Sequence, residues 1–176
     1  MTISTRCYRL GSRLRFLLKA GDEHGVHSPF MFELVDNHLN KASELPLHPA
    51  LTQTASQWPL HRRLAINAVI THLDPAIPLL CLSKENLETI TEINRVFYLS
   101  PALLSELKTD ELYFLKKNLG LNSSLVFGSP YENPSSAKNW KKFCDSLPKG
   151  VILDTWHAAV FFKRERQADE YFAVRF

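Results

Sequence analysis

The first sixty residues carry hydrophobic positions at helical spacing. In residues 5–20, leucines recur three or four positions apart while arginines mark another face, as in an amphipathic helix. Ser28 and Pro29 suit the N-cap and the first position of a second helix, expected over residues 29–41, because proline loses no hydrogen bond there. Residues 43–59 hold three prolines and little periodicity, which predicts a long connection.

From residue 60 onward, short apolar runs alternate with helical stretches. The alternation predicts buried strands at residues 77–82, 95–99 and 124–127, and helices at residues 60–73, 84–94, 109–119 and 136–147. Three β-rich segments then follow, at residues 151–154, 158–162 and 171–176. The gaps between them are too short for helical crossovers, so we expect these three to be antiparallel.

The pattern as a whole predicts an α/β fold. It comprises N-terminal helices, a reduced Rossmann-like sheet and a C-terminal antiparallel hairpin. We expect residues 1–59 to form a helical extension with a proline-containing connection, and residues 60–176 to form the α/β domain. A chain of 176 residues suits one domain, which buries roughly 70% of its unfolded surface.

Composition adds few constraints to this picture. The hydrophobic fraction of 45% and the charged fraction of 22% are ordinary globular values. No apolar run approaches the ~20 residues of a membrane span, and basic residues interrupt the N-terminal apolar stretches, so we expect neither a span nor a secretory signal but a cytoplasmic protein. Three widely spaced cysteines argue against a disulfide framework, and Cys81 is expected in the core.

The charge is concentrated in one place. The net charge of +3 is mild, but the first 20 residues hold five cations and no acid. Such a helix is a candidate for contact with nucleic acid or an acidic membrane surface. We favour a solvated basic face, and do not expect a nucleic-acid partner.

The chemistry of a nucleotide or adenosyl site is missing from the centre of the chain. Such a site needs a strand, a glycine-rich turn and a helix, so that backbone N–H groups approach the ligand. The first predicted strand and its turn read PLLCLSKEN (residues 78–86), without glycine, and no GxG pattern occurs anywhere. Ser83, Ser100 and Ser129 each follow a strand and are the candidate cofactor contacts, although none lies in a GxSxG turn.

Two pairs of residues that include histidine are candidates for other chemistry. His24 and His27 have the spacing of metal ligands. The third ligand of that site would come from its neighbours Glu33, Asp36 or His38. We favour hydrogen bonds of both histidines to the backbone of the turn, and expect no metal.

His157 is a candidate base, which Asp154 would orient. The two lie three residues apart with no nucleophile nearby in sequence. We therefore favour a structural role for both side chains.

Segments at both ends of the chain resemble one family. FLLK (residues 16–19) followed by HGVHSPFMFELV (residues 24–35) resembles the opening of a group of bacterial class I S-adenosylmethionine-dependent methyltransferases, which begins with a helical segment ending in HGxHSPF. VILDTWHAAVFFKRERQ (residues 151–167) is similar to that group's closing hairpin, in which a strand ending in Asp-Thr pairs with a strand reading VFFRKEQ. SLVFGSPYEN (residues 124–133) looks like its fifth strand and loop.

The resemblance implies a methyltransferase fold with S-adenosylmethionine as cofactor, but the chain departs from the family in its cofactor half. Residues 79–83 stand where an ELGTSxG-like loop begins, and Gly128-Ser129 stand where the family has an acidic pair. Ser100 or Pro101 replaces a strand-end aspartate. The resemblance therefore carries over scaffold residues alone: His24, His27, Ser28, Pro29 and Asp154.

These observations favour a methyltransferase-like protein that has lost S-adenosylmethionine binding. We expect a non-catalytic binding or structural module without cofactor, acting with a protein partner or as a homodimer. The alternative is an active S-adenosylmethionine-dependent methyltransferase with an atypical cofactor loop. It predicts a concave polar site near Ser83, Ser100 and Ser129.

Overall fold

The computed structural model describes residues 3–21, 28–53, 57–120, 122–146, 150–163 and 170–175. Among these residues one six-stranded sheet has the order β1-β2-β3-β5-β4-β6. The strands are β1 (Leu79–Cys81), β2 (Val96–Leu99), β3 (Ser124–Gly128), β4 (Val151–Asp154), β5 (Ala158–Phe162) and β6 (Glu170–Ala173). The helices are α1 (Ile3–Lys19), α2 (Pro29–Glu33), η2 (Leu34–Leu39), α3 (Pro49–Gln53), α4 (Leu60–Leu73), η3 (Lys84–Thr91), α5 (Pro101–Glu106), α6 (Thr109–Asn118) and α7 (Pro134–Asp145).

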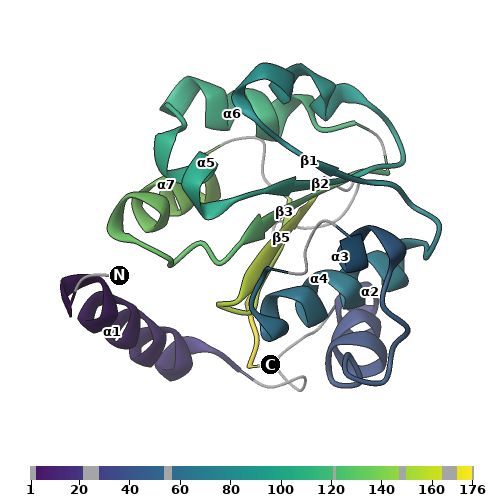
Figure 1. The fold of residues 1–176 in the computed structure, drawn as a ribbon, viewed down its shortest axis with the longest axis horizontal. Helices are drawn as coiled ribbons and strands as arrows, with labels where there is room; N and C mark the ends of the chain where they lie inside the picture. Colours follow the sequence, from purple (N-terminus) through teal and green to yellow (C-terminus); the bar gives the residue numbers. More distant parts are fainter. Residues whose placement is uncertain are drawn as a thin grey trace.

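Helices cover both faces of the sheet, so the predicted α/β fold is confirmed. Figure 1 shows α2, α3 and α4 on one side of the strands and α5, α6 and α7 on the other. Alternate strand residues point to opposite faces. Val96 and Tyr98 therefore join the core under α4, while Phe97 and Leu99 join the core under α5–α7.

The C-terminal hairpin is present as predicted, although the last strand runs differently. β4 and β5 pair in antiparallel register, with Val151 opposite Phe162, and β5 also pairs antiparallel with β3. β6, expected to be antiparallel, instead pairs parallel with β4. Because β5 fills the place between β3 and β4, the next strand reaches the other edge of β4 and runs in the same direction as β4.

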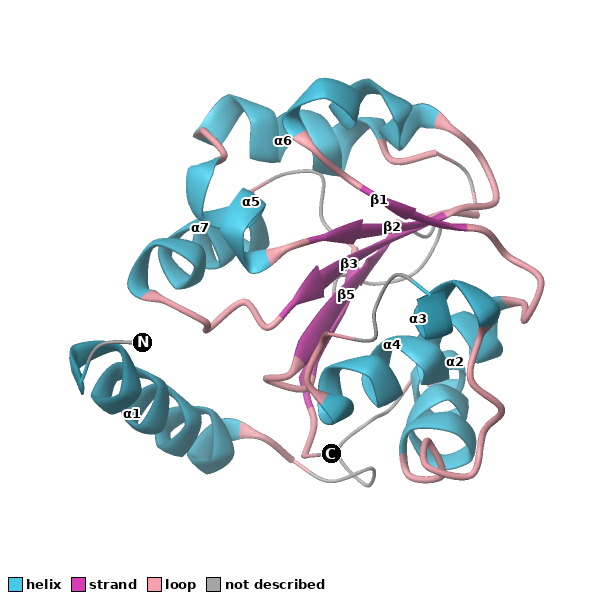
Figure 2. Ribbon diagram, in the orientation of Figure 1, coloured by secondary structure: helices cyan, strands magenta, loops and turns pink. Residues whose placement is uncertain are grey.

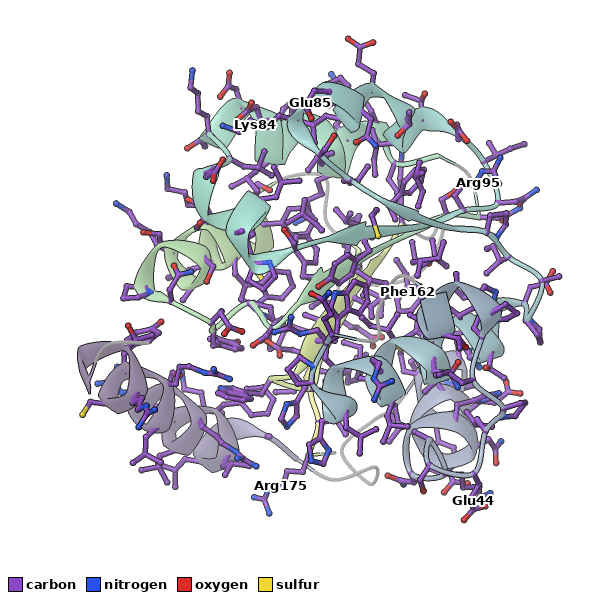
Figure 3. All side chains as sticks on the ribbon, in the orientation of Figure 1. Glu44, Lys84, Glu85, Arg95, Phe162 and Arg175 are labelled. Atoms are coloured by element: carbon purple, nitrogen blue, oxygen red, sulfur yellow. The ribbon has the colours of Figure 1, made fainter. Side chains whose placement is uncertain are left out.

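The second helix begins as the sequence predicts. Ser28 is the N-cap residue of α2 and Pro29 is its first residue. The helix continues as the π-helical stretch η2, and its inward positions are buried. The predicted connection over residues 43–59 contains the short helix α3. Residues on both sides of this connection share one core, which also contains Phe162, labelled in Figure 3.

Helix α1 is present as predicted, but its leucines face outward. Phe16 and Ala20 are buried against the body of the protein, whereas Leu14 is 56% exposed and Leu18 is 86% exposed. The body offers α1 an acidic side chain, Glu132, and an indole ring. These groups attract the arginines of α1 and leave the leucines in solvent. Figure 2 shows α1 at the periphery, apart from the other helices.

The end of α1 is joined to the last strand. The N–H of Gly21 donates to the carbonyl of Ala173 at 2.9 Å, and the guanidinium of Arg175 donates to the carbonyl of Leu17 at 3.3 Å. Arg175 is labelled beside the end of α1 in Figure 3. The helix is therefore held at this edge of the sheet by backbone as well as by side chains.

Cys81, expected in the core, is exposed, because β1 is an edge strand of the sheet.

Among the described residues, no helix is both long enough and apolar enough to cross a membrane.

Candidate functional site

Asp154, the last residue of β4, is fully buried and receives four hydrogen bonds from residues that the structure describes. Its Oδ2 atom accepts from Tyr131 Oη and Tyr171 Oη, each at 2.6 Å, and from Trp140 Nε1 at 3.2 Å. Its Oδ1 atom accepts from the backbone N–H of Trp156 at 2.9 Å. Three elements and the turn after β4 thus converge on one carboxyl group.

Burial controls the electrostatics of this network. Burial raises the pKa of Asp154, and the four hydrogen bonds work in the opposite direction because they favour the carboxylate. Burial and the neighbouring carboxylate raise the pKa of both Tyr131 and Tyr171. Both phenols consequently stay protonated and act as hydrogen-bond donors.

A cavity of about 720 Å³ lies over this network, between α1, α7, β4 and β6. Its size falls within the range of small-molecule sites, roughly 300–1,000 Å³. Its walls are apolar and aromatic, and Tyr131 and Tyr171 bring the hydroxyls at its polar end. The remaining apolar lining comes from Phe16, Ala137, Trp140, Ile152 and Ala173.

The charged groups of the cavity are of both signs. Arg15 and Lys19 of α1 line it, and Lys141 lines it while paired with Asp145 at 2.6 Å. Within the described part of the chain, the buried Oε2 atom of Glu170 has no hydrogen-bond partner. The cavity can therefore offer cations to an anionic group and an acceptor to a hydrogen-bond donor.

Cys144 also lines this cavity, but it is not activated as a nucleophile. Burial raises the pKa of its thiol to about 12. The thiolate is the nucleophilic form of cysteine, and it is scarce at neutral pH when the pKa is this high. The arrangement around Asp154 is therefore suited to binding rather than to covalent chemistry at Cys144.

The three serines that were candidate cofactor contacts lie at the carboxyl ends of β1, β2 and β3. Ser100 Oγ accepts from the N–H of Leu103 at 3.1 Å and caps α5, and the N–H of Ser83 donates to Asn86 Oδ1 at 2.6 Å. Ser129 is buried with a left-handed φ of 46°. Neither the cavity over Asp154 nor a second hollow of about 780 Å³, beside Pro78 at the opposite strand ends, is lined by these serines.

The structure does not bring His157 to Asp154. The ring of His157 stacks on His61 at 4.9 Å, and in the described chain it is not among the donors to the Asp154 carboxylate. Burial lowers the pKa of His157 to about 4, with further lowering by His61, Arg13 and other nearby cations. His157 is therefore neutral at physiological pH, and the predicted carboxylate-oriented base is not formed.

A group of charged residues surrounds His157. The carboxylate of Glu132 bridges Arg9 at 3.2 Å and Arg62 at 2.8 Å. Arg9 and Arg13 lie over the ring of Trp156, with 5.7 and 5.5 Å between each guanidinium carbon and the ring centroid. These contacts attach the inner side of α1 to the carboxyl edge of the sheet.

No cluster of three metal-binding side chains occurs in the part of the chain that the structure describes. His38, a candidate third ligand, packs its ring against His72 at 5.0 Å between centroids. His24 and His27 lie outside the described residues.

The sequence identified Asp154 but not the residues around it. Tyr131, Trp140 and Tyr171 come from a loop, a helix and an edge strand, and no local spacing connects them. A buried acid at the end of an apolar strand is the one local signal, because such a group requires partners. Comparisons with models of protein families, with curated proteins and with solved structures found no match to this chain.

Proposed function

We propose that this chain is a methyltransferase-like scaffold that has lost S-adenosylmethionine binding and acts as a non-catalytic module for a small organic ligand. The observation that carries the proposal is the cavity over Asp154. It combines a ligand-sized volume, aromatic walls and a fixed hydrogen-bonding end.

The carboxyl ends of the parallel strands support the loss of the cofactor. Ser83 and Ser100 are engaged in the starts of the helical segments that follow them. The end of β3 packs closely on a β2 side chain, since a Cβ at Gly128 would collide with the Tyr98 hydroxyl. Side chains thus fill a region where an adenosyl group needs bare backbone.

The lining of the cavity indicates the class of ligand. Aromatic and aliphatic walls favour an apolar or aromatic body. Arg15 and Lys19 favour an anionic group on that body, and the Oε2 atom of Glu170 favours a hydrogen-bond donor. We therefore expect an amphipathic organic anion that also carries an N–H or O–H group.

An anilinonaphthalene sulfonate dye is a suitable probe, because it combines an aromatic body, a secondary amine and one anionic group. We expect saturable fluorescence enhancement with one site per chain. Ala137→Trp places an indole in the cavity and should reduce the affinity about tenfold or more. Ala102→Trp, at an exposed alanine of α5, is the matched control and should bind like the wild type. Equal binding by the two variants would reject the cavity as the site.

Cofactor loss is tested by isothermal titration with S-adenosylmethionine and with S-adenosylhomocysteine. We expect no heat of binding at micromolar protein concentration. Micromolar affinity for either compound would overturn the non-catalytic proposal.

A second candidate is an active S-adenosylmethionine-dependent methyltransferase with an atypical pocket at the carboxyl edge. It is favoured by buried polar atoms that lack hydrogen-bond partners among the described residues: Ser129 Oγ, Arg62 Nε and Trp156 Nε1. Under this candidate the same titration gives binding, and Arg62→Ala weakens it. Ala137→Trp would then leave cofactor affinity unchanged.

A further inference from the structure

The outer face of α1 carries a stripe of exposed leucines, which we call the leucine stripe: Leu10, Leu14, Leu17 and Leu18. These residues are 63%, 56%, 38% and 86% exposed, respectively. They recur at three- and four-residue intervals and so form one continuous face. The opposite face is fixed by Phe16 and Ala20, so the stripe cannot turn inward without detaching the helix.

Cations border the leucine stripe on both sides. With 3.6 residues per turn, Arg6 falls along one border and Arg15 and Lys19 fall along the other, while Arg13, next to Arg6, is held over the ring of Trp156. Arg6, Arg15 and Lys19 are exposed, and the helix contains no acidic residue. Apolar side chains flanked by long cationic ones are typical of helices that lie in a membrane interface, where the leucines enter the acyl boundary and the cations reach the headgroups.

We propose that the outer face of α1 docks on an anionic lipid bilayer surface. Two other partners would match either the leucines or the cations of this face, but not both. A second copy of the chain would cover the leucines but would bring cations against cations. A nucleic acid would neutralise the cations but leave the leucines in water. An anionic bilayer satisfies both, because apolar burial and headgroup attraction act together.

This proposal does not rest on the ligand cavity. Arg15 and Lys19 lie at the cavity as well as along one border of the stripe, whereas the four leucines are not part of the cavity lining. Leucine variants therefore test the membrane surface without altering the proposed ligand site. Conversely, Ala137→Trp should leave membrane binding unchanged.

The experiment is co-sedimentation of the full chain with vesicles. We expect binding to vesicles of phosphatidylserine and phosphatidylcholine, little binding to pure phosphatidylcholine, and a decrease with added salt. The double variant Leu14→Ser/Leu18→Ser should bind at least about tenfold more weakly. Leu60→Ser, at a 57% exposed leucine of α4, is the matched control and should bind like the wild type. Circular dichroism establishes that each variant is folded.

Three results would overturn the proposal. The first is no binding to anionic vesicles, and the second is equal binding by the double variant and the wild type. The third is a dimer in light scattering that Leu14→Ser/Leu18→Ser converts to a monomer, since a second copy would then occupy the leucine stripe. Vesicle binding lost with the double variant and retained with Leu60→Ser would support the proposal.

Discussion

Tyr171 of β6 donates its hydroxyl hydrogen to Asp154 Oδ2 at 2.6 Å, diagonally across the parallel pair formed by β4 and β6. Tyr171 lies opposite Ile152, two residues before Asp154, and therefore on the same face of the sheet. The edge strand is thus attached through the carboxyl group that also holds Tyr131, and both tyrosines line the cavity. Stability and the proposed ligand site depend on the same side chain.

Removal of the Asp154 carboxyl group should destabilise the protein strongly. Asp154→Ala leaves two phenol donors and an indole N–H without their acceptor, and we expect a loss of about 3 kcal/mol in the free energy of unfolding. Asp154→Asn keeps one acceptor oxygen and the shape, so we expect a loss of about 1 kcal/mol. Urea denaturation measures both. Equal losses for the two variants would contradict the role of the hydrogen bonds.

The difference in unfolding free energy between the wild type and Asp154→Asn should depend on pH, in a direction that follows from the pKa of Asp154. Burial raises the pKa of Asp154 in the folded state, so its ionisation costs more there than in the unfolded chain. The contribution of Asp154 is fully present below the unfolded pKa of about 4 and is lost as the pH rises through the folded pKa. The wild type should therefore have its largest advantage over Asp154→Asn at low pH. An advantage that grows as the pH rises would show that the hydrogen bonds outweigh burial.

Lys116 is expected to stabilise the end of α7. Its buried ammonium donates to the carbonyls of Phe143 at 2.6 Å and Ser146 at 2.8 Å. Lys116→Met keeps a side chain of similar length but removes these charge-assisted hydrogen bonds. It should lower the free energy of unfolding by about 2–3 kcal/mol. Lys117→Met, at the exposed neighbouring lysine, is the control and should change stability by less than about 0.5 kcal/mol. Thermal unfolding of the two variants should separate them clearly.

More of the fold than of the candidate site can be predicted from the sequence, because the signals for strands and helix starts are local. Strand periodicity and N-cap residues such as Ser28 and Ser100 act over a few positions, so β2 and the starts of α2 and α5 can be predicted. The direction of β6 was predicted wrongly, because it depends on which edge of the sheet remains open after β5 is placed. The partners of Asp154 come from distant elements, and long-range packing brings them together.

The orientation of helix α1 also depends on long-range packing and could not be predicted from the sequence. Its periodicity correctly predicts an amphipathic helix, but periodicity cannot tell which face meets the body of the protein. Glu132 and Trp156, more than a hundred residues away, bind the arginines and so determine the orientation. Two faces with opposite chemistry were visible in the sequence, whereas their assignment required the tertiary structure.

Two glycines should respond in opposite ways to alanine. A Cβ at Gly120 would collide with the backbone carbonyl oxygen of Glu92, so Gly120→Ala should cost about 2 kcal/mol or more. Gly11, in the middle of α1, has nothing within 4 Å of the added Cβ. Gly11→Ala should therefore stabilise the helix by about 0.5–1 kcal/mol. Denaturant unfolding measures both effects, and destabilisation by Gly11→Ala would show that α1 meets another surface there.

His157 should make the protein sensitive to mild acid. Its pKa is lowered from about 6.5 to about 4, first by burial and then by His61 and the neighbouring arginines. The folded state therefore keeps the imidazole neutral while the unfolded chain takes up a proton. The stabilising contribution is present above the unfolded pKa of about 6.5, and it is lost as the pH falls from there through about 4.

The comparison that isolates this effect is wild type against His157→Gln, which does not titrate. The difference in unfolding free energy between them should be constant above pH 7 and should shift against the wild type between pH 6.5 and pH 4. All other titrating groups are common to both proteins, so their contributions largely cancel. A proton NMR titration supplies the direct value, since the Cε1–H signal of His157 should move near pH 4. Movement near pH 6.5 would mean that the imidazole is solvated, and that the contacts of α1 with this edge of the sheet are open in solution.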